Sequence, residues 1–500
     1  MAPNLWVRVD KLTPMLTGYS VALALSWTAC VQDSPAPTAT QPNVVVILAD
    51  DLGIGDLGCY NAASKIPTPH LDGLANGGTR FTDAHSPSAV CTPTRYGLLT
   101  GRYAWRTRLK SGVLWGSDPC LIQPDRVTLA RALSAVGYRT GAVGKWHLGF
   151  GTDNPVDFAE PLHPGPVDLG FDEFFGIPSS LDIPPYVYVL GDRAIEPPTA
   201  TVSGSAHRRQ KGGGFWRKGL AAPDFRHAEV LARFGFRAVE FIERSVRTDP
   251  DKPFFLYLAL SAPHTPWLPS EEFEGHSEVE HYGDFVGQVD GLVGKVLAVL
   301  NQLGVAEETL VVFTSDNGSH WPESDIKRHG HDANLGYRGQ KADIWEGGHR
   351  VPFLVRWPGR VQPAAECPDL LCLTDVYATV AALAHVALVP GAAEDSFDQS
   401  SAFLGRSGRV SARADVIHHS INGTFAMRSG PWKLIQGLGS GGFTAPKTRK
   451  PEEGGPTGQL YHLERDPFET KNLWLEEPEI VARLEARLLA QRTASQTRSN

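Results

Sequence analysis

The sequence is short of the features that mark nucleic-acid-binding, membrane-spanning and repeat proteins. Lys and Arg total 47 against 55 Asp and Glu, so the net charge of −8 is small for 500 residues and is spread along the chain. A chain without a basic excess gives no reason to expect a nucleic-acid partner. The apolar run at residues 16–29 is too short to span a bilayer comfortably as a helix. No internal repeat is present, which argues against a solenoid.

Cysteine is also scarce. The six cysteines are Cys30, Cys59, Cys91, Cys120, Cys367 and Cys372. If Cys30 and Cys91 serve the separate purposes described below, four remain, and an even number permits two disulfides without fixing their pairing. Cys367 and Cys372 are the most local pair. The alternative is four free, mostly buried thiols.

The N-terminus has the pattern of an export signal. Arg8 and Lys11 precede the apolar run, which ends in Thr28-Ala29-Cys30, so residues 1–30 are predicted to be a signal peptide. Small residues before Cys30 are typical of a bacterial lipoprotein signal, in which Cys30 becomes a lipidated N-terminus. Trp27 is not the aliphatic residue usual in such a signal, so simple cleavage and secretion stays open. We expect an exported protein, either periplasmic, secreted or lipid-anchored, whose membrane contact is through Cys30 alone.

The rest of the chain divides by pattern into a linker and two regions. Residues 31–42 are polar and Pro-rich, as in a flexible tether. From 43 to 400, apolar strand patterns alternate with helical ones, which predicts an α/β catalytic domain with a large sheet flanked by helices. The β-branched run at 43–49 predicts a strand buried on both faces. From 401 to 500, strand-like pieces at hairpin spacing and a final helix predict a small antiparallel subdomain.

A short stretch at Cys91-Thr-Pro-Thr-Arg95 has the composition of a chemical site. Pro93 suits the first turn of a helix, where its missing N–H is not needed. Cys91 is therefore expected just ahead of a helix N-terminus, where free N–H groups and the positive end of the helix dipole favour an anion. Arg95 adds a fork of donors suited to a tetrahedral oxyanion.

Further polar side chains follow predicted strands at the point where each strand ends. They are Asp50 and Asp51, Lys145 and His147, His264, and Asp316 and Asn317. Strand–helix alternation brings such strand ends to one edge of the sheet, where open α/β sheets bind ligands. Carboxylate and amide oxygens at close quarters suit Ca²⁺ or Mg²⁺. Lys145 and His147 are two apart in an extended segment, so we expect both to face the same anion.

These motifs, in this order, resemble those of the type I sulfatases, with arylsulfatase and N-acetylgalactosamine-6-sulfatase patterns the nearest in kind. Three strings carry the resemblance: Cys91-x-Pro-x-Arg95 with Leu98-Leu-Thr-Gly-Arg102, then Gly144-Lys-Trp-His-Leu-Gly149, then Arg338-Gly-Gln-Lys341 with Glu346-Gly-Gly-His-Arg-Val-Pro352. The resemblance covers roughly residues 43–475. It implies an alkaline-phosphatase-like fold and hydrolysis of a sulfate ester, with export favouring a sulfated carbohydrate.

The resemblance also implies which modified residue and which metal ion the site contains. A separate maturing enzyme would oxidise Cys91 to formylglycine, an aldehyde that hydrates to a gem-diol. A divalent ion, Ca²⁺ in most relatives with Mg²⁺ as the other choice, would be bound by Asp50, Asp51, Asp316 and Asn317. The modified Cys91 would supply a further oxygen to that ion.

Catalytic roles are implied in the same way. Arg95 and the metal would hold the gem-diol, and Asp316 would accept a proton from the hydroxyl that attacks sulfur. Sulfate oxygens would be held by Lys145, Lys341 and His264. Lys341 or His264 would protonate the leaving alcohol, and His147 would deprotonate the second hydroxyl to expel sulfate.

Other readings stay open at this point. A phosphodiesterase or phosphonate monoester hydrolase on the same scaffold is one, and a non-catalytic binder of sulfated glycan is another. A third is an unmodified, nearly inactive Cys91 in a host without the maturing enzyme. The basic segment 207–218 is either a loop that meets an anionic substrate or a solvated loop. Weaker candidates for gripping the substrate are His418, His419, His329, His331, Asn334 and Asp182.

Overall fold

The computed structural model describes residues 41–206, 214–406 and 412–498. The predicted signal peptide and nearly all of the linker lie outside the described residues, as does the segment 207–213 of the basic region. Within the described residues, none of the helices combines the length and apolarity needed to cross a membrane.

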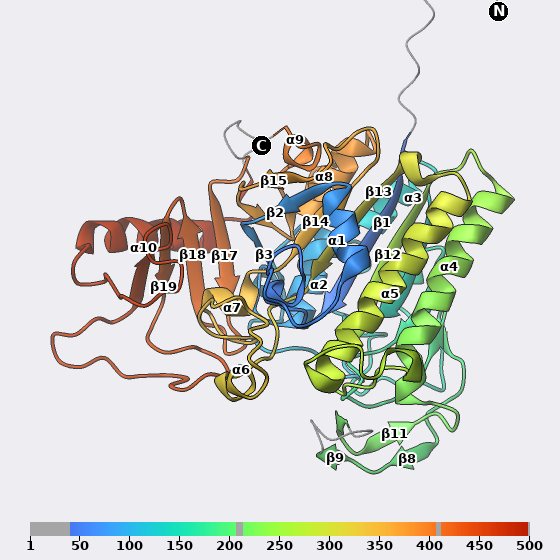
Figure 1. Cartoon of the computed structure of the whole chain (residues 1–500), viewed down its shortest axis with the longest axis horizontal. Helices are drawn as coiled ribbons and strands as arrows, with labels where there is room; N and C mark the ends of the chain where they lie inside the picture. The colour runs from blue at the N-terminus through green and yellow to red at the C-terminus, as the bar shows by residue number, and fades with distance from the viewer. Residues whose placement is uncertain (1–40, 207–213, 407–411, 499–500) are drawn as a thin grey trace, which may run out of the picture. The chain divides into compact units, whose positions relative to one another are not determined.

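A ten-stranded mixed sheet forms the centre of the structure (Figure 1). Its strand order is β15-β2-β14-β13-β1-β12-β4-β5-β6-β7. The strands are β1 (Asn43–Asp50), β2 (Thr79–Phe81), β4 (Arg139–Lys145), β5 (Glu173–Ile177), β6 (Val189–Leu190), β7 (Arg193–Ala194), β12 (Phe254–Pro263), β13 (Thr309–Ser315), β14 (Phe353–Arg356) and β15 (Ala365–Cys367). Antiparallel neighbours occur on both sides of a parallel centre.

The four central strands β13, β1, β12 and β4 are parallel. Every residue of β1 and β12 is buried, which explains why their sequences are apolar runs rather than alternating patterns. Because the strands run in the same direction, their carboxyl ends meet at one edge of the sheet. Leu48 of β1 lies beside Ala259 of β12 and Thr314 of β13 near that edge.

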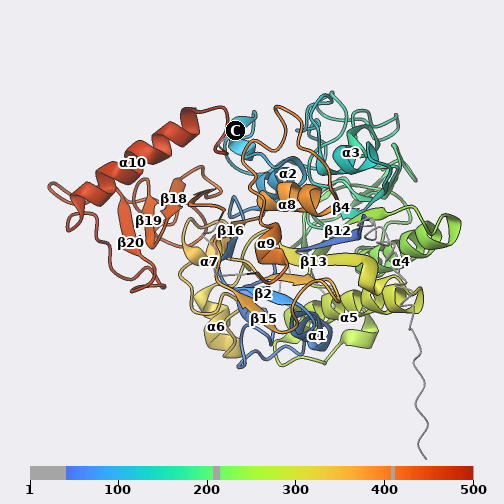
Figure 2. The same ribbon diagram turned by 90° about the horizontal axis from the view of Figure 1, so that it is seen from above.

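Helices cover both faces of the sheet (Figure 2). One face carries α1 (Pro69–Asn76), α4 (Val230–Thr248) and α5 (Glu280–Gln302), and the other carries α2 (Cys91–Thr100), α3 (Leu129–Ser134) and α8 (Asp375–Leu383). The shorter helices are α6 (Glu323–His329), α7 (Glu346–His349) and α9 (Ser400–Phe403). In α4, Leu231, Phe234, Phe241 and Ile242 recur at helical spacing and are all buried, so burial of this apolar stripe holds the helix on the sheet.

A second sheet of four antiparallel strands stands beside the first (Figure 1). It contains β17 (Asp415–His419), β18 (Phe425–Ser429), β19 (Trp432–Ile435) and β20 (Gln459–His462), and α10 (Pro478–Thr493) packs on it. The predicted fold class, a large mixed sheet with helices and a small C-terminal antiparallel sheet, is therefore confirmed. The described residues from Gln41 onward form one compact unit, so a domain boundary near residue 400 stays a prediction.

Short strands complete the described fold. They are β3 (Ala84–His85), β8 (Ala200–Val202), β9 (Ser205–Ala206), β10 (Phe215–Trp216), β11 (Gly219–Ala221) and β16 (Leu371–Cys372). All five cysteines in the described part of the chain are free thiols. The local pair Cys367–Cys372 is therefore not formed, because the two residues belong to strands of different sheets.

His227 is expected to make the stability of the fold depend on pH. Its ring lies among the aromatic rings of Tyr186, Trp216 and Phe225, with centroids 4.5, 4.9 and 5.1 Å away. Burial lowers the pKa of His227 from 6.5 to about 4. Below pH 6.5 the unfolded chain binds a proton that the folded chain rejects, so stability is lost as the pH falls from 6.5 towards 4.

Replacing His227 with Phe should flatten this pH dependence. Between pH 7 and pH 5 the variant is expected to lose about 2 kcal/mol less unfolding free energy than the wild type. Urea denaturation at the two pH values measures the difference. His276→Phe is the control, because His276 is exposed and its variant should keep the wild-type slope. An unchanged slope in His227→Phe contradicts the assignment.

Candidate active site

The predicted polar residues converge at the carboxyl edge of the central strands. Asp50 ends β1 and Lys145 ends β4, while His264 and Asp316 follow directly after β12 and β13. Cys91 is the first residue of α2, one position further into the helix than the sequence predicted. The neighbouring ends of four parallel strands thus meet a helix N-terminus.

Three buried ion pairs hold the carboxylates of this cluster. Lys145 Nζ lies 2.7 and 2.8 Å from the two oxygens of Asp50. Lys341 Nζ lies 2.8 Å from Asp51 Oδ2. Arg95 Nε donates to Asp316 Oδ2 at 2.9 Å, and Arg95 Nη2 forms an ion pair with the same oxygen at 2.8 Å. Buried carboxylates are costly without such partners, so the cations are what allows three of them to share one edge.

The two strand-end carboxylates differ in how readily they ionise. Burial alone would raise the pKa of Asp50, but Lys145, His264 and Arg95 together hold it well below its usual value. Burial and the neighbouring Asp50 carboxylate raise the pKa of Asp316. Asp50 is therefore a permanent anion, and Asp316 is the carboxylate of the two that is better suited to accept a proton.

The oxygen atoms of this cluster suit a divalent cation. Asp51 has a left-handed backbone (φ 64°), which turns the chain beyond β1 and brings the carboxylates of Asp50 and Asp51 together. Ligand atoms of Asp50, Asp51, Cys91 and His264 all lie within 4.8 Å of one another. Asn317 Nδ2 donates to Asp51 Oδ1 at 2.7 Å, which leaves the buried Asn317 Oδ1 without a partner. Carboxylate oxygens and a bare amide oxygen are ligands that Ca²⁺ or Mg²⁺ prefers.

Cys91 is held in a form that is chemically inert. Its Sγ lies 3.5 Å from Asp50 Oδ1 and is buried. Burial and the carboxylates of Asp316 and Asp50 raise the pKa of the Cys91 thiol, against the opposing effect of Lys145 and Lys341. The nucleophile of a cysteine is its thiolate, so an unmodified Cys91 is a poor one at neutral pH.

His147 is a neutral base with a fixed tautomer. Its Nε2 carries the proton, because it donates to the Leu114 carbonyl at 2.8 Å. Its Nδ1 is buried and has no partner, so a bare lone pair remains. Burial, Lys145 and Arg95 hold the pKa of His147 well below its usual value.

The geometry of the Lys145–His147 pair differs from the one expected. Strand β4 ends at Lys145, and His147 has a left-handed backbone (φ 56°), so the segment is not extended across both residues. Lys145 is buried against Asp50 and is not among the residues that line the pocket, whereas His147 is. The two residues therefore act on different parts of the site.

His264 and Lys341 complete the rim of the cluster. His264 Nδ1 donates to the Thr265 carbonyl at 2.6 Å, and Nε2 faces Asp51 Oδ2 at 3.7 Å. Burial opposes the charge on Lys341, but Asp51 and its neighbours raise the pKa of Lys341, so its ammonium group is retained. Both residues line the pocket, where Lys341 Nζ offers donors.

A pocket of about 580 Å³ opens over this cluster. Its floor contains Asp51, Cys91, His147, His264 and Lys341, and its walls include Val113, Trp115, Ile183, Phe215, Ile421 and Phe443. Arg217 forms an ion pair with Asp182, and its guanidinium lies over the rings of Trp115 and Phe215 at 5.2 and 5.1 Å. The sequence placed Arg217 within a basic segment, but it gave no signal for Trp115, because no recognisable motif surrounds that residue.

Among the weaker candidates, only Asp182 lines this pocket. His331 bonds Asp56, and Asn334 bonds the backbone of Ser319, so both have structural partners. His329 ends α6. His418 and His419 belong to β17, outside the pocket lining.

Comparison with known proteins agrees with this geometry. A model of the family described as Sulfatase matches residues 42–386. The chain belongs to the sulfatase family. It is 33% identical to the N-acetylgalactosamine-6-O-sulfatase of Bacteroides thetaiotaomicron, over 95% of this chain and 98% of that protein. It is 36% identical to human arylsulfatase A, over 87% of this chain and 84% of that protein.

Solved structures give the same result for the fold of this sulfatase. A structure from work on the metabolism of multiple glycosaminoglycans by Bacteroides thetaiotaomicron superposes with a TM-score of 0.80 at 31% identity. The match covers 91% of this chain and all of that one. The sulfatase is thus a sulfuric ester hydrolase of alkaline-phosphatase-like fold, as the sequence motifs predicted.

Proposed function

We propose that this sulfatase hydrolyses the sulfate ester of a sulfated carbohydrate, releasing the alcohol and inorganic sulfate, with Cys91 oxidised to formylglycine. The observation that carries the proposal is the buried, protonated Cys91 thiol at the centre of the charged cluster. A group placed where a nucleophile is needed, but unable to act as one, must be chemically changed first. The hydrated aldehyde supplies the hydroxyl that the thiol cannot.

The charged residues would bind the ester and the nucleophile together. Asp50, Asp51, Asp316 and Asn317 would hold Ca²⁺ or Mg²⁺, which when bound lowers the pKa of a nearby hydroxyl and attracts sulfate oxygens. Arg95 would orient the hydroxyls at position 91. Lys145, Lys341 and His264 would hold sulfate oxygens and help to balance the charge that builds up on them.

Proton transfers would be divided among three positions. Asp316, with its raised pKa, would take the proton of the attacking hydroxyl. Lys341 or His264, which both line the pocket, would protonate the leaving alcohol. His147 would remove the proton of the second hydroxyl through its bare Nδ1, so that sulfate leaves and the aldehyde re-forms. The fixed tautomer of His147 supports the last assignment.

The pocket walls support a sugar as the organic part. Asp182 Oδ1 is buried and lacks a hydrogen-bond partner, and the Arg217 donors lie beside it. Such an acceptor–donor pair suits sugar hydroxyls, and the half-exposed Trp115 offers an apolar face for a sugar ring. The relative from Bacteroides thetaiotaomicron is named for N-acetylgalactosamine 6-O-sulfate, which makes a 6-sulfated amino sugar the first substrate to test.

Trp115→Ala should weaken binding of a sulfated disaccharide. Loss of the stacked face is expected to raise KM by up to about tenfold with kcat nearly unchanged, since an aromatic contact contributes about 0.5–1.5 kcal/mol. Trp115→Phe should keep most of the affinity. Leu475→Ala is the control, because Leu475 is 60% exposed elsewhere on the surface. An unchanged KM in Trp115→Ala removes Trp115 from the substrate site.

The proposal includes export and maturation. The N-terminal pattern supports delivery to the periplasm or beyond, with Cys30 as the site of a lipid anchor if the signal is of the lipoprotein type. A separate formylglycine-generating enzyme would convert Cys91 before folding buries it. The partners of the mature protein would then be its sulfated substrates.

Two measurements test the function. Mass spectrometry of the peptide that carries Cys91, from protein co-expressed with a maturing enzyme, should show the aldehyde. That protein should hydrolyse an aryl sulfate faster than the phosphate mono- and diesters of the same phenol. Faster phosphate ester hydrolysis would favour the phosphodiesterase alternative, and an active preparation with only thiol at position 91 would refute the mechanism.

A further inference from the structure

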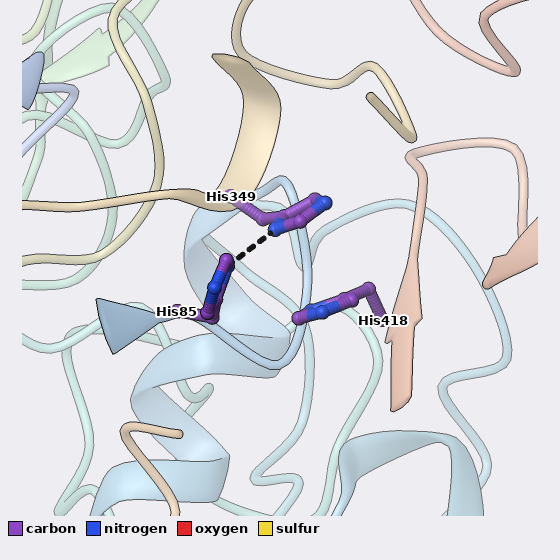
Figure 3. A group of neighbouring side chains, drawn as sticks. All are labelled: His85, His349 and His418. Carbon is purple, nitrogen blue, oxygen red and sulfur yellow. Dashed lines mark hydrogen bonds between the residues drawn. The ribbon is translucent and has the colours of Figure 1, made fainter. Parts of the chain in front are cut away.

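Three buried histidines lie together outside the pocket, beside strand β17 of the small sheet (Figure 3). His85 comes from β3, His349 ends α7 and His418 belongs to β17. Figure 3 shows the rings of His85 and His349 turned edge to edge, with the His418 ring alongside. The proposed catalytic steps use none of the three.

Hydrogen bonds fix the protons of two of these rings. Lys433 Nζ lies 2.9 Å from His349 Nε2, His349 Nδ1 lies 3.1 Å from His85 Nδ1, and His85 Nε2 lies 2.9 Å from Asp83. Lysine only donates and an ionised carboxylate only accepts. The chain therefore runs in one direction, from Lys433 through His349 and His85 to Asp83, with both rings neutral.

The third ring, that of His418, connects β17 to Ser86 and His349. His418 Nδ1 donates to the Ser86 carbonyl at 3.0 Å, and the His418 ring stacks on His349 with centroids 3.8 Å apart and planes 12° apart. The three rings are close enough for a metal site. However, the stacked rings of His349 and His418 do not aim their nitrogens at a common point, and Lys433 keeps the His349 proton on Nδ1. The three histidines therefore connect β17 to the segment after β3 by stacking and hydrogen bonds, and we call this connection the histidine tie.

The segment held by this tie leads directly into the nucleophile. Residues 86–90 connect β3 to Cys91. The backbone oxygen of His419 accepts from Ala89 N and Ser88 Oγ, at 3.0 and 3.1 Å. Ala89 O in turn accepts from the N–H of Ala342, next to Lys341, at 2.8 Å. The end of β17 thus bonds the segment before Cys91, and this segment in turn bonds the loop that carries Lys341.

We propose that His418 is a positioning residue, through which the C-terminal sheet fixes the segment before Cys91 against the carboxylates of the large sheet. The inference rests on the proposed function. It gives the small sheet a part in catalysis although it supplies none of the proposed catalytic groups. A small displacement of a nucleophile from its line of attack is costly to kcat, whereas the floor and walls that bind substrate are left in place.

Two variants of His418 separate the hydrogen bond from the bulk of the ring. The amide of Asn places a donor near the position of Nδ1, whereas that of Gln reaches the position of Nε2. His418→Gln should lower kcat by about tenfold to a hundredfold with KM unchanged, and His418→Asn should restore kcat to within about twofold of the wild type. Rates are expressed per aldehyde at position 91, and circular dichroism reports folding.

The outcomes are distinct. An equal loss in both variants, or a folded His418→Gln with wild-type kcat, overturns the proposal. If His418→Gln does not fold, Ser88→Ala tests the neighbouring contact of β17 with the same segment, because the Ser88 hydroxyl donates to the His419 carbonyl. Lower kcat at constant KM supports fixation of the segment by β17, and wild-type kcat overturns the proposal. Failure of the proposed function itself would show separately, as a wild type that carries the aldehyde and does not turn over an aryl sulfate.

Discussion

A Cys91→Ser variant is expected to react once with substrate and then stop. Serine provides one hydroxyl at the first residue of α2, whereas the hydrated aldehyde provides two. After attack on sulfur, a serine sulfate has no second hydroxyl from which His147 can take a proton, so the sulfate group stays attached. Steady-state kcat should fall by about 10⁵-fold or more, as in other enzymes that lose their nucleophile.

The measurement is a single-turnover assay with an aryl sulfate. Phenol release should be limited to at most one equivalent, and intact-mass analysis should show one added SO₃ group on the protein. Cys120→Ser is the matched control, because Cys120 is a partly buried thiol outside the pocket and its variant should keep wild-type kcat. Sustained turnover by Cys91→Ser would show that the second hydroxyl is not needed.

Asp50→Asn is expected to destroy both the charge balance and the proposed metal site. The substitution leaves the buried Lys145 ammonium facing an amide instead of the carboxylate that it contacts at 2.7 Å. Breaking a buried ion pair on one side costs about 3–5 kcal/mol of unfolding free energy. With a proposed metal ligand and the charge of the cluster both changed, kcat/KM should fall by about a thousandfold or more.

Calcium distinguishes the two effects of this substitution. The wild type should gain about 2.7 kcal/mol at a Ca²⁺ concentration of 100 times Kd, and Asp50→Asn should gain far less. Asp56→Asn is the control for loss of a buried carboxylate, since Asp56 bonds His331 and Tyr282 and should affect stability without changing the calcium response. A full calcium response in Asp50→Asn would exclude Asp50 as a ligand.

Local sequence was enough to predict the frame of the site. The β-branched run of β1 could only be a strand buried on both faces, and the position of Pro93 indicated a helix beginning near Cys91. Placing Asp50 and Asp316 after such strands then required only that the strands be parallel. These features depend on residues near one another in the chain, which is why periodicity and motif spacing could reveal them.

The tertiary structure decided which groups touch and which state each one takes. The tautomer of His147 depends on the carbonyl of Leu114, 33 residues away, and the charge of Lys341 depends on Asp51, 290 residues away. The position of Trp115 over Arg217 and the separation of Cys367 from Cys372 are likewise set by packing between distant segments. Burial and the charges of residues distant in sequence control pKa values and hydrogen bonds. A local sequence pattern predicts neither the burial nor these neighbours.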